Sequence, residues 1–241
     1  MEFVGKTVWI TGASQGIGRG LALHFAKRGA KLAILARNLE GLTETAALAT
    51  SLGARCFHAQ ADLRVKEDVV SFVSAAVDQG FPPDVIIHNA ADTTSKPFLE
   101  TSLDEIESIV QTNITGVLLL SRQAAPHMAH AGNGIMVYLS SLAGYKPNPM
   151  QTVYSISKGG LNSVSSGLGA DLRAYGIHTI NVALMGIGDG PGQYSLDALA
   201  LRLERAMDRR EHEVFLYRSS GFLMRLYGAF PGLARWRSPR T

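Results

Sequence analysis

The stretch Thr11-Gly12-Ala13-Ser14-Gln15-Gly16-Ile17-Gly18 follows the apolar run Thr7–Ile10 and opens a segment with helical spacing, Gly18–Arg28. Glycines at such a turn let the backbone approach a pyrophosphate closely, and the helix that follows offers unpaired N–H groups and a positive dipole end. The spacing is Gly-x3-Gly-x-Gly, which differs from the common Gly-x-Gly-x-x-Gly, and a purely structural turn is the alternative. The position between a strand and a helix favours a phosphate-binding loop.

Short apolar or β-branched runs alternate with longer helical patterns along the chain, which predicts βαβ units and a parallel sheet. The expected strands are nearly continuously apolar, as is typical of strands buried on both faces. They are Thr7–Ile10, Lys31–Leu35, Ala54–His58, Val85–His88, Gly134–Leu139, Thr179–Ala183 and Glu213–Leu216. The expected helices include Gly18–Arg28, Leu39–Leu52, Lys66–Gln79, Leu103–His130, Met150–Tyr175 and one that Ser195 caps and that runs to about Arg210. The pattern predicts an α/β protein with a doubly wound sheet of about seven parallel strands and helices on both faces.

The composition fits one large domain. Of the 241 residues, 46% are hydrophobic and 18% are charged, which argues against a disordered or collagen-like protein. Cys56 is the only cysteine, which excludes an intrachain disulfide and argues against a Cys-rich zinc module. No run approaches the roughly 18 apolar residues of a membrane span, and the N-terminus lacks the basic and apolar regions of a signal peptide. We therefore expect a cytoplasmic protein.

The net charge of +3 is unevenly distributed. Residues 1–201 carry 14 Lys and Arg against 16 Asp and Glu, whereas residues 202–241 carry 9 against 4. The basic excess belongs to the C-terminal end, so no nucleic-acid partner is expected. Residues 218–241 form a basic amphipathic extension, with helical spacing of Phe222, Leu223, Leu226, Tyr227 and Phe230. Such an extension packs on its own domain or on a partner subunit, or it makes peripheral contact with an anionic membrane.

Two residues near strand ends bear on the dinucleotide that the glycine loop would bind. The second predicted strand ends in Leu35-Ala36-Arg37-Asn38, with no acidic residue. In NAD-binding sites an acid near this point holds the ribose 2′-hydroxyl, whereas an arginine can pair with a 2′-phosphate. Arg37 therefore favours NADP(H) over NAD(H), with a surface arginine as the alternative. Asp62, just past the third strand, is expected either to meet the adenine or to cap the next helix.

A phenol and an ammonium group lie four residues apart in Tyr154-Ser155-Ile156-Ser157-Lys158. On a helix they share one face, so both can act on the same substrate atom. A nearby cation stabilises tyrosinate and lowers the tyrosine pKa, which makes Tyr154 a usable acid or base. Ser141 follows a predicted strand that should end at the same edge of the sheet, where its hydroxyl can hydrogen-bond a carbonyl oxygen. A surface pair four residues apart is the alternative for Tyr154 and Lys158 alone.

These pieces resemble the short-chain dehydrogenase/reductase family, in its order and spacing, over about residues 5–217. The matching pieces are Thr11–Gly18, Asp62, Asn89-Ala90, Asn113, Ser140-Ser141, Tyr154-x3-Lys158 and Asn181. The resemblance implies a single-domain Rossmann fold with a nicotinamide cofactor, so residues 1–217 would form a dinucleotide-binding catalytic domain. It also implies a homodimer or homotetramer built on the two long helices, Leu103–His130 and Met150–Tyr175.

The resemblance further implies a role for each matching residue. Tyr154 would donate a proton to a substrate carbonyl as hydride arrives, or accept one in reverse, and Ser141 would polarise that carbonyl. Lys158 would hold the nicotinamide ribose and lower the Tyr154 pKa, and Asn113 would support Lys158 through a water. Ser141 is preferred to Ser140 because of its spacing from Tyr154. The implied cofactor-binding residues are Gly12, Ser14, Gln15, Gly16, Ile17, Gly18, Arg37, Asp62, Leu63, Asn89, Ala90, Tyr154 and Lys158. No metal site is expected, because His127 and His130 have no third ligand beside them.

Two stretches depart from the family pattern. The family usually has Asn-Asn-Ala-Gly after the fourth strand, whereas this chain has His88-Asn89-Ala90-Ala91. The methyl group at position 91 crowds the cofactor, or the backbone there needs no positive φ. After the sixth strand, Met185-Gly186-Ile187-Gly188-Asp189-Gly190 lacks the Pro and the Thr that would contact the nicotinamide carboxamide. Cofactor affinity is then weaker, or this glycine-rich, flexible loop orders only with substrate.

We therefore expect an NADP(H)-preferring carbonyl reductase, reversible in principle as an alcohol dehydrogenase, with a hydrophobic small-molecule substrate. One alternative is a non-catalytic dinucleotide-binding protein of the same fold, which would use the 185–190 loop and the basic extension for partner or membrane contact. The full set of Asn113, Ser141, Tyr154 and Lys158 argues against it, because a binding module needs no such set. The other alternative is a nucleotide-sugar epimerase or dehydratase, but only about fifty residues follow the sixth strand, too few for the usual substrate domain.

Overall fold

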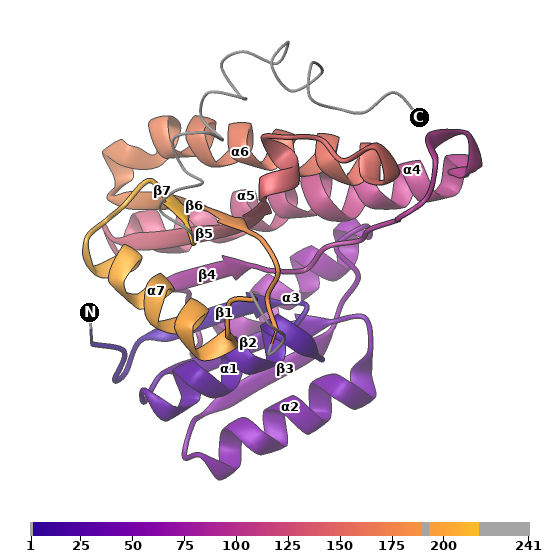
Figure 1. The fold of residues 1–241 in the computed structure, drawn as a ribbon. Helices are drawn as coiled ribbons and strands as arrows, with labels where there is room; N and C mark the ends of the chain where they lie inside the picture. The colour runs from indigo at the N-terminus through magenta and orange to yellow at the C-terminus, as the bar shows by residue number, and fades with distance from the viewer. Residues whose placement is uncertain (1, 189–192, 217–241) are drawn as a thin grey trace.

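The computed structural model describes residues 2–188 and 193–216. Its strands form one parallel sheet in the order β3-β2-β1-β4-β5-β6-β7 (Figure 1). The strands are β1 Thr7–Thr11, β2 Lys31–Ala36, β3 Cys56–Gln60, β4 Val85–His88, β5 Gly134–Ser141, β6 Ile177–Leu184 and β7 Glu213–Phe215. The strand order reverses between β1 and β4, which is where open α/β sheets bind ligands. The predicted doubly wound α/β fold is confirmed.

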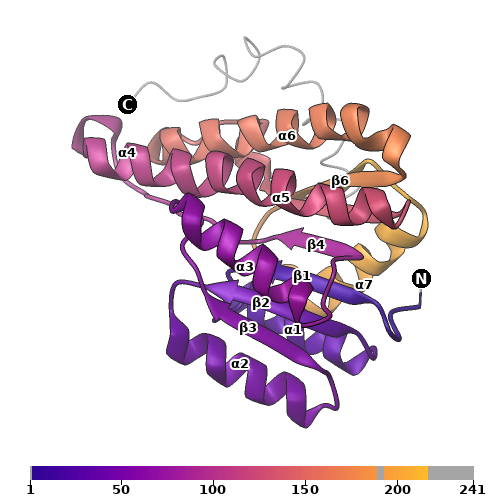
Figure 2. The same cartoon turned by 180° about the vertical axis from the view of Figure 1, so that it is seen from behind.

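The helices cover both faces of this sheet (Figure 1 and Figure 2). They are α1 Gly16–Lys27, α2 Leu39–Ser51, α3 Lys66–Asp78, α4 Leu103–Val110, α5 Gly116–His130, α6 Thr152–Leu172 and α7 Leu196–Asp208. Helices α1, α2 and α7 contribute to one hydrophobic core, and α3, α5 and α6 to a second core on the other face. Each strand therefore lies between two helical layers, which explains its nearly continuous apolar sequence.

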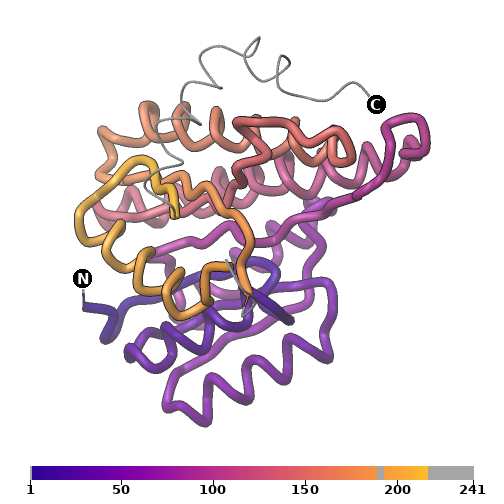
Figure 3. Tube along the Cα trace, in the orientation of Figure 1, coloured from indigo at the N-terminus to yellow at the C-terminus, as the bar shows by residue number. Residues whose placement is uncertain are grey.

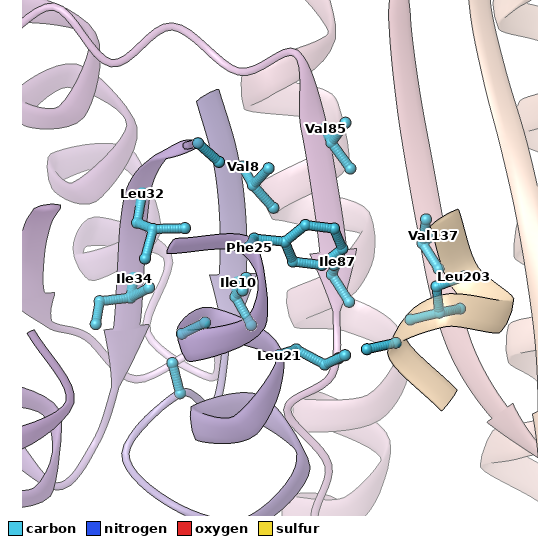
Figure 4. Close-up of a cluster of buried hydrophobic side chains, with 14 of the residues drawn as sticks. Val8, Ile10, Leu21, Phe25, Leu32, Ile34, Val85, Ile87, Val137 and Leu203 are labelled. Atoms are coloured by element: carbon cyan, nitrogen blue, oxygen red, sulfur yellow. The ribbon is translucent and has the colours of Figure 1, made fainter. Parts of the chain in front are cut away.

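The first core is built from neighbouring strand residues in register. Val8 of β1 lies beside Leu32 of β2 and Val85 of β4, and Leu21 and Phe25 of α1 pack over these strands (Figure 4). All five side chains are fully buried. Each such side chain contributes about 1.5–3 kcal/mol of hydrophobic stabilisation, so this core fixes the start of α1 over the sheet.

The second core contains the largest buried side chain of the sheet. Trp9 and Ile86 point to this face, where Trp9 meets Phe72 of α3 edge to face with ring centroids 5.2 Å apart. The indole Nε1 of Trp9 donates to the carbonyl of Phe81 at 2.8 Å. The only polar group of this side chain is thereby satisfied, which makes its full burial favourable.

Helix α7 lies beside α1, although the two are far apart in the sequence (Figure 3). Glu204 of α7 receives hydrogen bonds from Arg28 at 2.7 and 2.6 Å, and its Oε1 lies 2.6 Å from His24 Nε2. Gly20 of α1 makes room for the first residue of α7, because a Cβ at Gly20 would lie 1.8 Å from Leu196 Cδ2. Ser195 caps α7 by accepting from the Ala198 N–H. These contacts fix the far end of the loop that follows β6.

The predicted helix Leu103–His130 is interrupted. A π-helical turn, Gln111–Thr115, separates α4 from α5, and Asn113 is buried within it. The continuous helical pattern of the sequence could not reveal this turn, which inserts one extra residue and rotates the side chains that follow. The other predicted long helix, Met150–Tyr175, is α6 with 3₁₀ turns at both ends.

Candidate active site

Two adjoining pockets open at the carboxyl ends of the central strands. The glycine-loop pocket has a volume of about 390 Å³ and contains ten of the predicted cofactor residues, Gly12, Ser14, Gln15, Gly16, Ile17, Arg37, Asp62, Leu63, Asn89 and Ala90. The tyrosine pocket has a volume of about 290 Å³ and contains Ser141, Tyr154 and Lys158. Both pockets include Ile17, Asn89 and Ala91, so they form one cleft. Gly18 and Asn113 line neither pocket.

Glycine is required at two places in the loop after β1. Gly12 has a φ of +67°, and a Cβ there would lie 2.9 Å from the Ala90 Cα. Gly18 lies behind the loop, where a Cβ would lie 2.3 Å from the Gly12 carbonyl oxygen. Gln15 is the N-cap residue of α1, and its side chain makes no capping hydrogen bond. The first N–H groups of α1 therefore have no side-chain cap and face the pocket, as a phosphate site requires.

Asn89 joins β4 to the glycine loop. Its Nδ2 donates to the carbonyls of Thr11 at 2.8 Å and Gly12 at 3.2 Å, and its own N–H donates to Thr11 Oγ1 at 3.0 Å. Thr112 lies across the pocket with its side chain buried, and its Oγ1 has no hydrogen-bond partner among the described residues. An unsatisfied buried hydroxyl in a pocket costs free energy until a ligand pairs with it. The glycine cradle and this hydroxyl fit a dinucleotide.

The far end of the glycine-loop pocket holds Arg37 and Asp62. Arg37 is exposed at the end of β2, and its positive charge contributes to a lowered pKa at Asp62. The main cause of that lowering is Arg64, whose Nε and Nη2 donate to the Asp62 carboxylate at 3.0 and 2.5 Å. Asp62 does not cap α3, because the N-cap residue of that helix is Val65. Asp62 therefore lines the pocket without capping α3, and its contact with the adenine stays a prediction.

Tyr154 and Ser141 meet in the tyrosine pocket. Burial raises the pKa of Tyr154, and a hydrogen bond with Ser141 opposes this rise. Tyr154 is the first member of the Tyr-x3-Lys pair on α6, and Ser141 is the last residue of β5. The two hydroxyl groups therefore come from different elements and belong to one pocket, as carbonyl polarisation and proton transfer require.

Lys158 lies below Tyr154, with its Nζ 5.6 Å from the centre of the Tyr154 ring. Its Nζ donates to the Leu139 carbonyl at 2.8 Å, and burial lowers the pKa of Lys158 to about 8. The expected lowering of the Tyr154 pKa by this cation is not found: at this separation the loss of hydration around the phenol dominates.

Asn113 is buried behind the cleft and lines neither pocket. Its Nδ2 donates to the Asp92 carbonyl and to Ser157 Oγ, both at 2.9 Å, and its Oδ1 accepts from the Asp92 N–H at 2.7 Å. Ser140 contacts the Lys158 carbonyl at 3.0 Å and Asn162 Oδ1 at 2.6 Å. Ser140 thus bonds to α6, although both Ser140 and Ser141 line the tyrosine pocket. The choice of Ser141 as the substrate-facing serine stays a prediction.

The loop after β6 is tied at its base. Tyr194 N–H donates to the Gly186 carbonyl at 2.8 Å, and Gly188 N–H donates to the Tyr194 carbonyl at 3.1 Å. The described part of the predicted flexible loop is therefore held together by backbone pairing, while residues 189–192 lie outside the described residues. The backbone at position 91 does not require a glycine, because Ala91 has no positive φ: Arg210 is the one non-glycine residue with positive φ in residues 2–188 and 193–216.

Several residues of the site were not predicted from the sequence. Thr112 lines the glycine-loop pocket, and Ser157 supports Asn113 from α6. Arg64 engages Asp62, and Asp92 engages Asn113. Arg64 and Ser157 lie within two residues of a predicted site residue, and Thr112 directly precedes Asn113, so proximity in sequence was the available signal. This signal does not identify them, because a residue next to a site residue can equally face the core or solvent.

Three further sequence predictions concern a metal site, a membrane span and the C-terminal extension. No group of three or more His, Cys, Asp and Glu side chains within residues 2–188 and 193–216 could hold a metal ion. No helix in the described part of the chain is long and apolar enough to cross a bilayer. The basic extension, residues 218–241, lies outside the described residues.

Comparison with known proteins identifies the family of this chain. The chain matches the short chain dehydrogenase family over residues 6–191. An uncharacterized oxidoreductase of Thermotoga maritima is 35% identical over 211 residues, which is 88% of this chain and 80% of that protein. The ketoacyl reductase HetN of a Nostoc species is 34% identical over 174 residues, which is 72% of this chain and 61% of that protein. A short-chain dehydrogenase from Sphingobium yanoikuyae, solved in complex with NADPH, is 27% identical with a TM-score of 0.81, covering 98% of this chain and 97% of that one. The protein is therefore an oxidoreductase of the short-chain dehydrogenase family.

Proposed function

We propose that the protein is an NADP(H)-dependent carbonyl reductase, reversible as an alcohol dehydrogenase. The observation that carries this proposal is that Tyr154 and Ser141 line one pocket, which is continuous with the glycine-loop pocket. A protein that only binds a dinucleotide has no use for this pair. The non-catalytic alternative therefore has less support.

The chemistry of the proposed reaction follows from the positions of the side chains. When bound, the nicotinamide supplies hydride to the carbonyl carbon or takes it back from the alcohol. Tyr154 donates its phenolic proton to the carbonyl oxygen, and Ser141 hydrogen-bonds to that oxygen and increases its polarity. The raised pKa of Tyr154 keeps this proton on the phenol at neutral pH. Lys158, beneath the ring, stabilises the tyrosinate that forms.

Binding of the cofactor would be shared among the residues of the glycine-loop pocket. The N–H groups at the start of α1 would hold the pyrophosphate, and Asp62 and Leu63 would flank the adenine. Arg37 stands at the end of β2, where it would pair with a 2′-phosphate, so we assign a preference for NADP(H) and keep NAD(H) as the alternative. The NADPH complex of the Sphingobium yanoikuyae dehydrogenase supports this assignment.

The substrate is proposed to be a hydrophobic carbonyl or alcohol. Leu139, Leu184, Met185 and Ile187 line part of the tyrosine pocket beside its polar groups, so they offer apolar contacts to the rest of the substrate. A ketoacyl reductase among the relatives fits such a substrate. A homodimer or homotetramer, a cytoplasmic location and peripheral membrane contact through residues 218–241 stay predictions.

The test of the cofactor is the binding of NADPH and NADH to the purified protein, followed by nicotinamide fluorescence. We expect NADPH to bind at least about tenfold more tightly, a difference of about 1.4 kcal/mol, and Arg37→Ala to remove that difference. Arg55→Ala provides a matched control, because Arg55 directly precedes β3 and lies outside the glycine-loop pocket. If neither nucleotide binds, the proposal is wrong.

If NADPH binds, a panel of hydrophobic ketones tests the reaction. NADPH oxidation is followed by the loss of its absorbance, with Tyr154→Phe as the control that lacks the proton donor. Turnover of at least one ketone by the wild-type protein, absent in Tyr154→Phe, is the expected result. Equal turnover by both proteins would contradict the assigned role of Tyr154.

A further inference from the structure

A continuous set of hydrogen bonds runs from the adenosine end of the cleft toward the Tyr154 helix. It begins at Asp62, whose carboxylate is held by Arg64, and Arg64 Nη1 donates to Ser108 Oγ of α4 at 3.1 Å. Ser108 Oγ in turn donates to Asp92 Oδ2 at 2.6 Å. A serine hydroxyl has one proton, so the bond from arginine leaves that proton for the carboxylate. Both bonds of Ser108 are charge-assisted and therefore strong.

The same set continues from Asp92 into the buried interior. Asp92 pairs with the Asn113 side chain through its backbone N–H and carbonyl, at 2.7 and 2.9 Å. Asn113 Nδ2 also donates to Ser157 Oγ at 2.9 Å, and Ser157 Oγ donates to the Tyr154 carbonyl at 2.8 Å. Asn113 and Ser157 are 1% and 2% exposed. Water cannot replace a lost partner at such buried positions, so each bond fixes the orientation of the next.

This arrangement joins three parts of the proposed reductase. The segment after β4 supplies Asn89 and Ala91 to both pockets, and Asp92 directly follows it. The π-helical turn supplies Thr112 to the glycine-loop pocket and Asn113 to the hydrogen-bond set. The first turns of α6 supply Tyr154. Asp92 and Ser108 line neither pocket, so they affect cofactor and substrate only through the residues that they hold.

We propose that Asp92 and Ser108 are positioning residues that hold the 89–92 segment, the π-helical turn and the start of α6 in one arrangement. This inference rests on the proposed function, since Tyr154 is the group positioned. The Asp92 carboxylate accepts a hydrogen bond from Ser108 and so holds the 89–92 segment against α4. The Asn113 amide bonds to the Asp92 backbone and to Ser157, which bonds to the Tyr154 carbonyl, so the position of the segment determines that of Tyr154. Loss of either side chain displaces the proton donor relative to the cofactor, while the glycine loop and the start of α1, which neither residue contacts, would keep the pyrophosphate contacts.

The kinetic test uses Asp92→Ala and Ser108→Ala with whichever ketone the wild-type protein reduces. Each variant is expected to lower kcat about tenfold or more, because small misplacements of a reacting group have effects of this size. The KM for NADPH should change less than about twofold. The double variant should be no worse than the poorer single variant, because both changes break the same connection. Asp92→Asn retains an acceptor oxygen and should restore most of kcat.

A second test needs no turnover. Hydrogen exchange of the Ser157 and Lys158 amides, which lie in α6, is measured with and without NADPH. Asp92→Ala and Ser108→Ala are expected to speed this exchange about fivefold or more, at the lower end of typical couplings between sites. Glu107→Ala, an exposed residue of α4 next to Ser108, is the control and should leave exchange and kcat unchanged.

The outcomes separate this inference from the proposed function. Wild-type exchange rates in both alanine variants, or a rise in the KM for NADPH with kcat unchanged, would overturn the positioning role. Failure of the wild-type protein to bind NADPH would instead overturn the cofactor assignment, and the exchange experiment on the free protein would still decide the positioning role. If Asp92→Ala does not fold, Ser108→Ala, which removes a single hydroxyl, decides the question.

Discussion

Lys158 donates a hydrogen bond from its buried Nζ to the main-chain carbonyl of Leu139 at 2.8 Å. Burial lowers the pKa of Lys158 to about 8, well below its ordinary value of 10.5. A buried ammonium group without a carboxylate partner is destabilising, since its hydration is lost and one carbonyl replaces it. Stability therefore does not explain the position of this lysine beneath Tyr154, whereas its proposed role in stabilising tyrosinate does.

Replacing Lys158 with methionine should raise the free energy of unfolding of the free protein by about 1 to 2 kcal/mol. The change removes a desolvation cost of about 3 kcal/mol, the equivalent of the pKa shift, and leaves the Leu139 carbonyl without this donor at a cost of about 1 kcal/mol. The gain should be present below pH 8 and shrink as the pH rises to 10.5, because over that interval the folded lysine has lost its proton while the unfolded one keeps it. Urea unfolding at pH 7 and pH 10 measures both effects.

Lys27→Met is the matched control for this change, because Lys27 is exposed at the end of α1. It should leave stability unchanged within about 0.5 kcal/mol. If Lys158→Met is instead less stable than wild type, the packing and the hydrogen bond of Lys158 contribute more to the free energy of unfolding than the burial of its charge costs.

Removal of the Tyr154 hydroxyl should separate chemistry from binding. Tyr154→Phe is expected to lower kcat by about 10²- to 10⁴-fold, the usual contribution of a positioned acid, and to leave the NADPH dissociation constant within about twofold of wild type. Ser141→Ala should lower kcat less, because it removes a polarising hydrogen bond but no proton donor. Steady-state kinetics together with fluorescence titration measure the two quantities. Equal losses of kcat and NADPH affinity would instead indicate a misfolded pocket.

The pH dependence of reduction should follow Lys158. As the pH rises through about 8, the free enzyme loses the cation that stabilises tyrosinate, so kcat/KM should decrease with a midpoint near that value. The phenol of Tyr154 keeps its proton over the same interval because burial raises its pKa. Initial rates at fixed ketone and NADPH concentrations between pH 6 and pH 10 test this. A midpoint that is the same in Lys158→Arg, which stays charged, would assign the decrease to another group.

Acid stability should depend on His88, the residue that stands where the family usually has asparagine. Its ring is buried, stacks on Tyr138 at 4.8 Å and lies 3.1 Å from Ser121 Oγ, and burial lowers its pKa to about 3. Between pH 6.5 and pH 3 the unfolded state binds a proton that the folded state does not. Stability should therefore fall with decreasing pH by about 1.4 kcal/mol per pH unit from this residue alone.

His88→Gln should reduce that slope by about the same amount, because glutamine does not titrate. His130→Gln, at the exposed C-terminal end of α5, should leave the slope nearly unchanged. Unfolding free energies measured at pH 4, 5, 6 and 7 for the three proteins provide the comparison. Identical slopes in His88→Gln and wild type would show that the ring is protonated in the folded state.

The glycine loop offers a comparison between two helical glycines. Gly18→Ala should destabilise the protein by about 1–3 kcal/mol and weaken NADPH binding, because its Cβ would lie 2.3 Å from the Gly12 carbonyl oxygen. Gly167→Ala on α6 meets no atom within 4 Å and should stabilise by about 0.5–1 kcal/mol. Thermal unfolding and NADPH titration of both variants give the result. If Gly18→Ala is as stable as Gly167→Ala, the glycine loop moves away from the methyl group added at position 18.

The fold and much of the site were predictable because they depend on local patterns. Apolar runs flanked by helical segments specify buried parallel strands, and the glycine spacing after β1 specifies a close turn. Residues at the ends of parallel strands must meet at one edge of the sheet, so Gly12, Asn89 and Ser141 could be placed together from the sequence. Helical spacing put Tyr154 and Lys158 on one face, and the family resemblance added Asn113 and the expected role of each residue.

Other features depend on contacts between distant segments, which no local pattern contains. The π-helical turn around Asn113 packs against α6, as does α4, although the sequence reads as one continuous helix. Burial, not the nearby cation, decides the direction of the Tyr154 pKa shift, and burial depends on everything packed around the ring. The link from Arg64 through Ser108 and Asp92 joins residues that look like ordinary surface residues in the sequence. Periodicity thus determined which faces are buried, and only the tertiary packing decided which buried polar groups meet.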